Sequence, residues 1–287
     1  MRVLITGGRG QLGRALSAAL TGDEVSAPGH DELDITNEAA VRETLERTAA
    51  DVVIHAAAWT DTAGCERDPE RAMLVNAGGA GIVAEVCASS GARMIHVSSN
   101  EVFDGEADRP YAEDAQVRAI NEYGRSKLEG ERAVAAASPG HAIVRTSWLY
   151  GPGRVSFPEK ILQAARSGGS LRGVTDEIAS PTWTVDLAEA IARLIRREPS
   201  GIYHLTNTGY CSRLEWARRI LSVGGQADVL VSPATQSDFA APYRKPVFSA
   251  LANTRAAALG VTMRSWEDAL ADHLAGSASS ALAADNR

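Results

Sequence analysis

Short apolar runs alternate with longer segments of helical periodicity through the first half of the chain. The helix expected at 11–20 places Leu12 and Leu16 on one face, as in a helix that packs on one side. The run at 51–56 is almost continuously apolar, which is typical of a parallel strand buried on both faces. The pattern predicts strands at 2–6, 24–27, 51–56, 93–97 and 142–146, and helices at 11–20, 38–49, 69–89 and 122–137. This alternation predicts right-handed crossovers and an α/β fold with a doubly wound parallel sheet.

The second half of the chain is less regular and begins with the break Gly151-Pro152-Gly153. Periodicity there predicts helices at 157–167, 184–197, 213–223 and 266–274, strands at 170–174 and 201–205, and a loop with strand fragments at 229–250. We expect a larger sheet domain at 1–150 with 181–206 returning to it, a smaller C-terminal lobe from 151–180 and 207–275, and a disordered tail at 276–287.

Composition narrows the class of protein. The 287 residues include 29 Lys and Arg against 36 Asp and Glu, a net charge of −7. This balance argues against a nucleic-acid or membrane-surface role, although it allows a local basic pocket. No apolar run approaches the roughly 20 residues that span a bilayer, and Cys65, Cys87 and Cys211 lie too far apart for a disulfide framework or a zinc knuckle. We expect a cytoplasmic protein without nucleic-acid, membrane or metal partners.

Three glycines lie at the junction of the first strand and the first helix. Gly7, Gly10 and Gly13 are spaced three residues apart. Early glycines allow a tight turn and let backbone N–H groups approach a pyrophosphate, while the last allows the helix to pack closely on the strand. The alternative is a plain strand–helix turn. In this context the pattern predicts a dinucleotide cradle in a Rossmann-type domain.

The end of the second strand normally reads the adenosine ribose of a dinucleotide. An acidic side chain there favours the 2′-hydroxyl and a basic one the 2′-phosphate. Residues 26–34 contain no arginine, and His30 and Asp34 are the polar candidates. Asp34 either approaches the adenine or caps a helix, and the choice between NADPH and NADH stays open.

Tyr123 and Lys127 stand four positions apart in the helix expected at 122–137. That spacing puts both side chains on one face, and a nearby ammonium favours phenolate, so we expect Lys127 to lower the pKa of Tyr123. An isolated pair of this kind is typical of a solvated surface. Ser99, however, follows the strand at 93–97, and the carboxyl ends of parallel strands face the ligand crevice. Its hydroxyl can bond a substrate carbonyl while Tyr123 protonates it.

The glycine loop, the serine and the Tyr–Lys pair, in this order, resemble the extended short-chain dehydrogenase/reductase superfamily. Further segments are similar to the dTDP-4-dehydrorhamnose reductase family: 8–13, 33–36, 55–60, 75–77, 102–105, 123–131, 145–148, 180–182, 244–246 and 265–270. The resemblance runs in order over residues 1–275.

The resemblance implies reduction of the 4-keto group of a dTDP-4-keto-6-deoxy sugar with NADPH or NADH. It implies that Tyr123 is the general acid, that Lys127 tunes it and binds the ribose, and that Ser99 donates to the carbonyl. The implied cofactor contacts are Gly7, Gly10, Gln11, Leu12, Gly13, His30, Asp34, Ala56, Ala57, Ala58, Asn76, Tyr123 and Lys127. The implied substrate contacts are Ser99, Asn100, Glu101, Trp148, Arg244 and Lys245.

The chain departs from the family at Ser99-Asn100-Glu101, where Thr-Asp-Tyr is usual, and at His30, where arginine is frequent. Related 4,6-dehydratases carry an Asp-Glu pair at the first place, of which only Glu101 remains here. Glu101 either changes the sugar specificity or simply turns outward. The alternatives to a reductase are an epimerase or dehydratase that retains NAD, and a non-catalytic regulatory subunit. Some family members form metal-linked homodimers; a homodimer stays open, but only Glu189 suggests such a metal site and we expect none.

Overall fold

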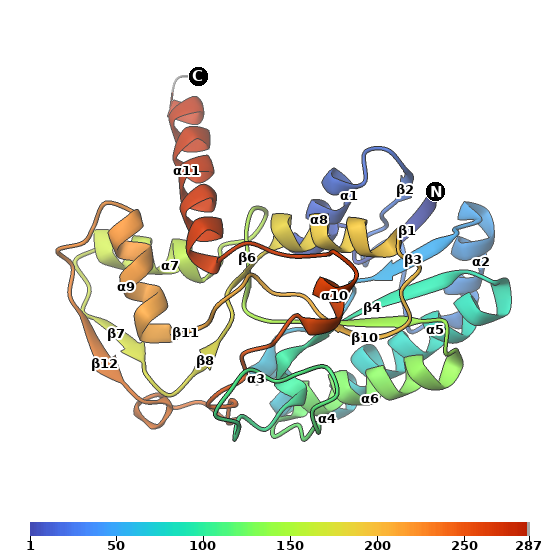
Figure 1. The fold of residues 1–287 in the computed structure, drawn as a ribbon, viewed down its shortest axis with the longest axis horizontal. Helices are drawn as coiled ribbons and strands as arrows, with labels where there is room; N and C mark the ends of the chain where they lie inside the picture. The colour runs from blue at the N-terminus through green and yellow to red at the C-terminus, as the bar shows by residue number, and fades with distance from the viewer. Residues whose placement is uncertain (286–287) are drawn as a thin grey trace.

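A six-stranded parallel sheet forms the larger part of the molecule (Figure 1). The computed structural model describes residues 1–285, and side chains as far as Gly276. The strands lie in the order β2 (Glu24–Ser26), β1 (Arg2–Thr6), β3 (Val52–His55), β4 (Arg93–Ser99), β5 (Ala142–Thr146) and β10 (Gly201–His204). Every neighbouring pair is parallel. The doubly wound α/β fold expected from the sequence is confirmed.

Helices cover both faces of the sheet because alternate strand residues point to opposite sides. On one face Val3 and Ile5 pack in a core with α1 (Gln11–Ala19) and α8 (Thr184–Ile195). On the other face Leu4 packs in a core with three helices, α2 (Glu38–Thr48), α5 (Gly79–Ser90) and α6 (Glu122–Ala137). Within the sheet, β2 lies on one side of β1, and β3 and the strands that follow it lie on the other side. A reversal of this kind opens a ligand crevice at the carboxyl ends of the strands.

The smaller lobe lies beside the sheet, at the left of Figure 1. Its strands form three pairs: β7 (Leu171–Val174) with β12 (Val231–Ala234), β8 (Ile178–Ala179) with β11 (Cys211–Ser212), and β6 (Leu149–Tyr150) with β9 (Thr182–Trp183). Its helices are α7 (Phe157–Arg166), α9 (Arg213–Val223) and the beginning of α11 (Trp266–Asp285). Trp216 and Leu221 of α9 anchor two apolar cores that hold these pieces together.

Several elements differ from the sequence expectation. The helix predicted at 69–89 consists of α4 (Pro69–Ala72), a π-helical turn η1 (Met73–Gly78) and α5. Elements without a sequence prediction are the short strands β6, β8, β9 and β11, the helices α3 (Thr62–Arg67) and α10 (Thr254–Ala258), and the 3-10 turns η2 (Asn100–Val102) and η3 (Gln236–Asp238). These are short, and short elements depend on tertiary packing more than on periodicity.

The C-terminal segment also differs. The sequence predicts a helix ending at 274 and a disordered tail at 276–287, but α11 continues to Asp285 and stands away from the body of the molecule (Figure 1). The small residues that suggested disorder include many alanines, which are strong helix formers. Residues 286–287 lie outside the described part of the chain.

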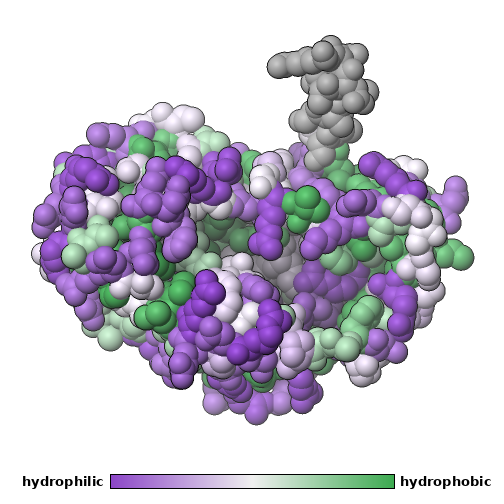
Figure 2. All heavy atoms as spheres, turned by 180° about the vertical axis from the view of Figure 1, so that it is seen from behind, coloured by the Kyte–Doolittle hydropathy of each residue, from purple (hydrophilic) through white to green (hydrophobic). Residues whose placement is uncertain are grey.

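One helical stretch has the length and composition of a membrane span, which the sequence reading did not recognise. It is Pro69–Ser90, 22 residues long, and it contains an 18-residue window with a mean hydropathy of 1.4. Half of this window is buried inside the protein, and Val83 and Val86 of the stretch belong to the core beneath the sheet. We interpret it as a core helix. Figure 2 shows the molecule from behind, where polar residues and small apolar patches are interspersed.

Candidate active site

The glycine loop after β1 fits closely against two neighbouring loops. Gly7 has φ +70°, and a Cβ on it would lie 2.9 Å from the backbone of Ala57. A Cβ on Gly13 would lie 2.4 Å from the carbonyl oxygen of Gly7. Gly10 precedes α1 in extended conformation, so the N-terminal amides of the helix open toward the crevice. These tight approaches form the backbone cradle that a dinucleotide pyrophosphate needs.

The other cradle residues predicted from sequence lie in three different settings. Ala56 and Ala57 follow β3 beside Gly7 and are half-buried, as is Ala58. Gln11 donates its side-chain amide to the Gly151 carbonyl at 2.6 Å, and so ties the loop to the start of the smaller lobe. Leu12 is buried in the core against the sheet.

The loop after β2 is organised by local hydrogen bonds. Asp34 Oδ1 accepts from the backbone N and the hydroxyl of Thr36 at 2.9 and 2.7 Å, and these bonds lower the pKa of Asp34. The cap of α2 is Asn37, which accepts from Ala40 N at 3.2 Å. Asp34 therefore stabilises a turn before α2 and does not cap the helix. His30 lies exposed in the same loop.

Arg9 is a residue that the sequence reading missed. It belongs to the glycine loop, but its guanidinium reaches the loop after β2 and pairs with Asp31 at 2.7 Å and Glu32 at 2.8 Å. Rossmann-type folds usually place the ribose-reading residue after β2, whereas this arginine precedes that strand in the sequence. The available signal was its place between two glycines of the loop, Gly8-Arg9-Gly10.

Asn76 connects the cofactor side of the crevice to the helix that carries Tyr123. It lies in the π-helical turn η1 and is 1% exposed. Its oxygen accepts from Trp59 N at 2.7 Å, and its amide donates to Trp59 O at 3.0 Å and Ser126 Oγ at 2.9 Å. These bonds occupy both amide hydrogens, so Asn76 holds the loop after β3 in place.

Helix α6 presents Tyr123 and Lys127 one turn apart. Its cap is Asn121, which accepts from Gly124 N at 2.8 Å. A Cβ on Gly124 would lie 2.1 Å from the carbonyl oxygen of Glu101, so only glycine lets the first turn of α6 approach η2 this closely. The approach brings Tyr123 next to Ser99 at the end of β4, and the two side chains hydrogen-bond.

Lys127 points into the sheet. Its ammonium, which is nearly fully buried, donates to Val97 O at 2.8 Å and lies 3.5 Å from His96 Nε2. Burial lowers the pKa of Lys127 to about 8, and the Glu131 carboxylate opposes this effect. His96 stacks on His55, and burial keeps both imidazoles neutral by lowering their pKa. The lysine thus has uncharged partners on the sheet side.

The expected lowering of the Tyr123 pKa is wrong for this structure. Burial raises the pKa of the phenol, Glu101 raises it further, and the hydrogen bond with Ser99 only partly opposes them. Lys127 does not offset these effects because its ammonium is directed at Val97 O. Tyr123 is therefore protonated at neutral pH, which is the state that a general acid requires.

Glu101 turns inward, which decides the orientation that the sequence left open. Its carboxylate accepts from Asn121 Nδ2 at 2.7 Å. Burial raises the pKa of Glu101, while Lys245 and the bond from Asn121 oppose the shift. The preceding Asn100 is buried and donates to Ser249 Oγ at 2.7 Å, so its amide is used to join η2 to the loop before α10.

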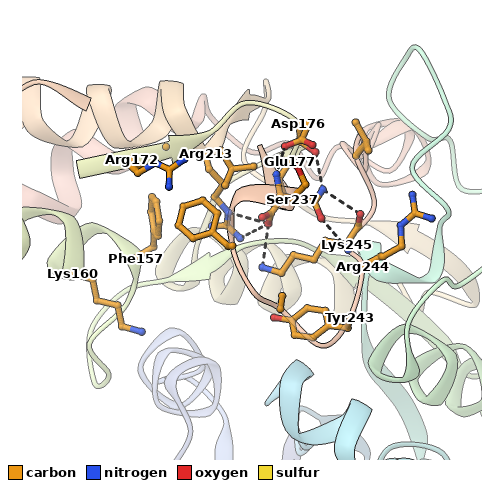
Figure 3. A pocket seen from close by; sticks show the side chains of 16 residues that line it. Phe157, Lys160, Arg172, Asp176, Glu177, Arg213, Ser237, Tyr243, Arg244 and Lys245 are labelled. Carbon is orange, nitrogen blue, oxygen red and sulfur yellow. Dashed lines mark hydrogen bonds and ion pairs between the residues drawn. The ribbon is translucent and has the colours of Figure 1, made fainter. Parts of the chain in front are cut away.

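A pocket of about 770 Å³ lies in the smaller lobe (Figure 3). Five cationic side chains line it: Lys160, Arg172, Arg213, Arg244 and Lys245. Figure 3 shows Arg213 and Lys245 converging on Glu177, with distances of 2.9 and 3.4 Å to Glu177 Oε1. Burial alone would raise the pKa of Glu177, but the two cations lower it overall.

Trp148 lies behind this pocket. The Arg213 guanidinium stacks 3.5 Å from the centre of the Trp148 ring, and Trp148 itself stacks on Trp216 at 5.3 Å. Of the predicted substrate residues, Arg244 and Lys245 line the pocket. Ser99 and Glu101 are not among its lining residues and lie near Tyr123, and Asn121 Nδ2 joins Glu101 to the backbone of Arg244. Arg213 and Glu177 were not predicted, because nothing local in the sequence distinguishes them from surface charges.

Metal ligands are not gathered anywhere in the described part of the chain. Among the described side chains, those of residues 1–276, no three His, Cys, Asp or Glu groups lie close enough together to hold an ion. Glu189 lies beside Arg14 in a separate hollow between α1 and α8.

The fold and the site together define the class of protein. A glycine cradle at a reversal of strand order, with a tyrosine and lysine on the helix beside a strand-end serine, is the arrangement of the extended short-chain dehydrogenases/reductases. The family model described as the RmlD substrate binding domain matches residues 1–278. The chain belongs to this family, the dTDP-4-dehydrorhamnose reductases.

Individual relatives agree over nearly the whole chain. A dTDP-4-dehydrorhamnose reductase of Mycolicibacterium smegmatis is 39% identical, covering 96% of this chain and 85% of that protein. A dTDP-4-keto-6-deoxy-D-glucose reductase of Streptomyces niveus is 37% identical, covering 94% and 95%. The crystal structure of the Bacillus anthracis dTDP-4-dehydrorhamnose reductase in complex with NADP superposes with a TM-score of 0.92 at 33% identity, covering 96% and 99%.

Proposed function

We propose that this protein reduces the 4-keto group of a dTDP-4-keto-6-deoxy sugar, such as dTDP-4-dehydrorhamnose, with NADPH or NADH. The observation that carries the proposal is the protonated Tyr123 phenol, hydrogen-bonded with Ser99 and close to Glu101, which in turn interacts with Lys245 of the cationic pocket. The names of the relatives support the same reaction. We also propose that it works in the cytoplasm, as a biosynthetic enzyme.

The larger domain binds the dinucleotide in this proposal. Gly7, Gly10 and Gly13 hold the pyrophosphate against the first turn of α1. Ala57 borders the same cradle. When bound, the cofactor supplies the hydride that goes to C4 of the sugar.

The proton comes from the protein. Ser99 donates a hydrogen bond to the carbonyl oxygen of the sugar and positions it. Tyr123 then transfers its phenolic proton to the same oxygen as negative charge develops there. The raised pKa of Tyr123 ensures that the proton is present at neutral pH. Lys127, one turn along α6, directs its ammonium at Val97 O and not at the phenol.

The smaller lobe binds the sugar nucleotide. Arg213 and Lys245 present cations that suit a diphosphate, because Glu177 holds both side chains at the pocket wall. Phe157 and Tyr243 line the same pocket and offer aromatic faces for the thymine ring.

The inward orientation of Glu101 favours a second candidate function. A carboxyl group beside Tyr123 is suited to proton transfer at a sugar carbon, as in an epimerase or dehydratase that regenerates its NAD. The reductase remains the better-supported function, because Asn100 presents an amide bonded to Ser249 at the place where such a dehydratase needs a second acid.

The deciding experiment measures oxidation of NADPH and of NADH by the purified protein with dTDP-4-keto-6-deoxy sugar, before and after 3,5-epimerisation. Stoichiometric oxidation with either sugar is the expected result. Conversion of the sugar without net oxidation would instead support the epimerase or dehydratase. An inert protein that still binds the dinucleotide would point to a regulatory subunit.

A further inference from the structure

Arg9 is held between two carboxylates at the mouth of the cofactor cradle. Its Nη1 lies 2.7 Å from Asp31 Oδ2 and its Nη2 lies 2.8 Å from Glu32 Oε1. We call Arg9, Asp31 and Glu32 the arginine clamp. Arg9 comes from the glycine loop, whereas both carboxylates come from the loop after β2.

The backbone fixes where the clamp lies. Gly8 N donates to Pro28 O at 2.9 Å, and a Cβ on Gly8 would lie 2.2 Å from Ala27 O. The glycine loop is therefore in direct contact with the end of β2. In dinucleotide-binding folds the side chains at this place read position 2′ of the adenosine ribose.

A ligand at this place can reach all three side chains. Arg9, Asp31 and Glu32 are 56%, 64% and 48% exposed. Ion pairs at such exposure contribute little stability, so the charge that the two carboxylates present to a ligand matters more than the strength of their pairs with Arg9.

The charges of the clamp are unequal. One guanidinium faces two carboxylates, a formal sum of about −1 by the usual ionisation states. A 2′-phosphate would meet both carboxylates before it could displace them from Arg9, whereas a 2′-hydroxyl can donate to either one. Glu32 is also anchored, since it accepts from Gly29 N at 2.8 Å.

We propose that the arginine clamp selects the dinucleotide: Asp31 and Glu32 favour NADH, and they hold Arg9 away from the 2′-phosphate of NADPH. This rests on the proposed function only in taking the cradle to bind a nicotinamide dinucleotide. Arg9 is a latent phosphate ligand, and the two carboxylates are the groups that keep it from serving as one.

The test compares dissociation constants of NADH and NADPH, measured by the change in nucleotide fluorescence with no sugar present. We expect the wild-type protein to bind NADH at least about tenfold more tightly than NADPH, the ratio that one charge-assisted contact supplies. In Asp31→Asn/Glu32→Gln the amides keep the shape of both side chains and the bond from Gly29, but the charge is gone. This variant should bind NADPH about tenfold more tightly than the wild type does.

A second variant isolates the contribution of the arginine. Adding Arg9→Ala to the double variant should abolish the gain in NADPH affinity and leave NADH affinity close to that of the double variant. The NADPH gain should also shrink as ionic strength rises, because the groups are exposed. The matched control is Glu38→Gln, which removes one carboxylate of a similarly exposed pair with Arg42 on α2. It should leave the ratio of the NADPH and NADH dissociation constants unchanged.

Two results would overturn the proposal. One is tighter binding of NADPH than of NADH by the wild type, and the other is a ratio of the NADPH and NADH dissociation constants that is the same in the wild type and all variants. Both measurements are independent of turnover. A protein that binds nucleotides as expected but reduces no keto sugar would refute the proposed function and leave the clamp intact. A protein that binds neither nucleotide refutes both.

Discussion

At the residue scale, the chemistry of the site depends on which charges surround Tyr123. The sequence spacing placed Lys127 as its nearest ionic neighbour. In the folded protein the ammonium is directed into the sheet, and Glu101 instead affects the phenol by raising its pKa. Tyr123 is consequently a weak acid that stays protonated at neutral pH, as a proton donor for the reduction must.

Replacing Tyr123 by Phe removes the proton donor and leaves the ring. We expect kcat to fall by about 10² to 10⁴, the range for loss of a general acid, while the dissociation constant of the dinucleotide stays nearly constant. Single-turnover kinetics and a nucleotide titration measure the two quantities. A parallel loss of nucleotide affinity would show that the tyrosine is a cofactor ligand and that its assignment as the acid is wrong.

Replacing Glu101 by Gln removes a negative charge that raises the pKa of Tyr123. The reaction needs protonated Tyr123, so activity is lost as pH rises through the Tyr123 pKa. We therefore expect the pKa of Tyr123 to be lower in Glu101→Gln than in the wild type. Ultraviolet difference titration of the phenol at alkaline pH, with Tyr123→Phe identifying its signal, measures this pKa. An unchanged or higher pKa would contradict this electrostatic coupling.

At the scale of elements, α6 is the part that aligns the site. Gly124 lets it approach η2, and Gly130 lets it approach the π-helical turn η1, since a Cβ there would lie 2.5 Å from Asn76 O. On the sheet side Arg145 of β5 makes two bonds to Glu131 of α6, at 2.8 and 2.7 Å, and both side chains are almost fully buried. The helix is therefore fixed at both ends of its catalytic turn.

Breaking the buried pair should destabilise the fold strongly. Glu131→Gln leaves the Arg145 guanidinium buried without a counter-charge, and we expect a loss of about 3 to 5 kcal/mol in the free energy of unfolding. Urea denaturation measures it. The matched control is Glu129→Gln, which removes an exposed pair with Arg132 on the same helix and should cost less than about 1 kcal/mol. Similar losses in the free energy of unfolding for the two variants would show that the buried pair is no more important to stability than the exposed one.

At the scale of the whole molecule, the two lobes divide the work in our proposal. The glycine cradle lies on the sheet domain, and the cationic pocket is assembled from residues of 157–177 and 213–247, in the smaller lobe. Asn121 links the two parts, because its amide donates to both Glu101 and Arg244 O, at 2.7 and 3.0 Å. Because the cradle and the pocket lie on different parts of the molecule, a mutation in one should change the affinity for its own ligand and leave the affinity for the other ligand unchanged.

Arg213→Gln tests this separation. We expect the KM for the sugar nucleotide to rise by about tenfold or more, since a charge-assisted contact to the diphosphate is lost, while the dissociation constant of the dinucleotide is unchanged. Steady-state kinetics and a nucleotide titration measure the two. Because Arg213 also stacks on Trp148, a thermal melt must show that the lobe is still folded. A lowered dinucleotide affinity with an intact lobe would contradict the division.

The sequence by itself determined the parallel sheet, the glycine cradle and the pairing of Tyr123 with Lys127 on one helix face. These features depend on periodicity and short spacing, which local geometry converts directly into structure. The short elements η1, η2 and α3 escaped it, as did the extension of α11 to Asp285.

Only the tertiary structure decided which charges meet. Arg9 contacts carboxylates some 22 positions later in the chain, Glu177 gathers Arg213 and Lys245 from two other segments, and Lys127 donates to a strand 30 positions earlier. Such pairings follow from how helices and loops pack on the sheet, and no local pattern encodes them. Electrostatic energies depend on distance and burial, so the protonation of Tyr123 and the setting of Arg9 could be derived only once the chain was folded.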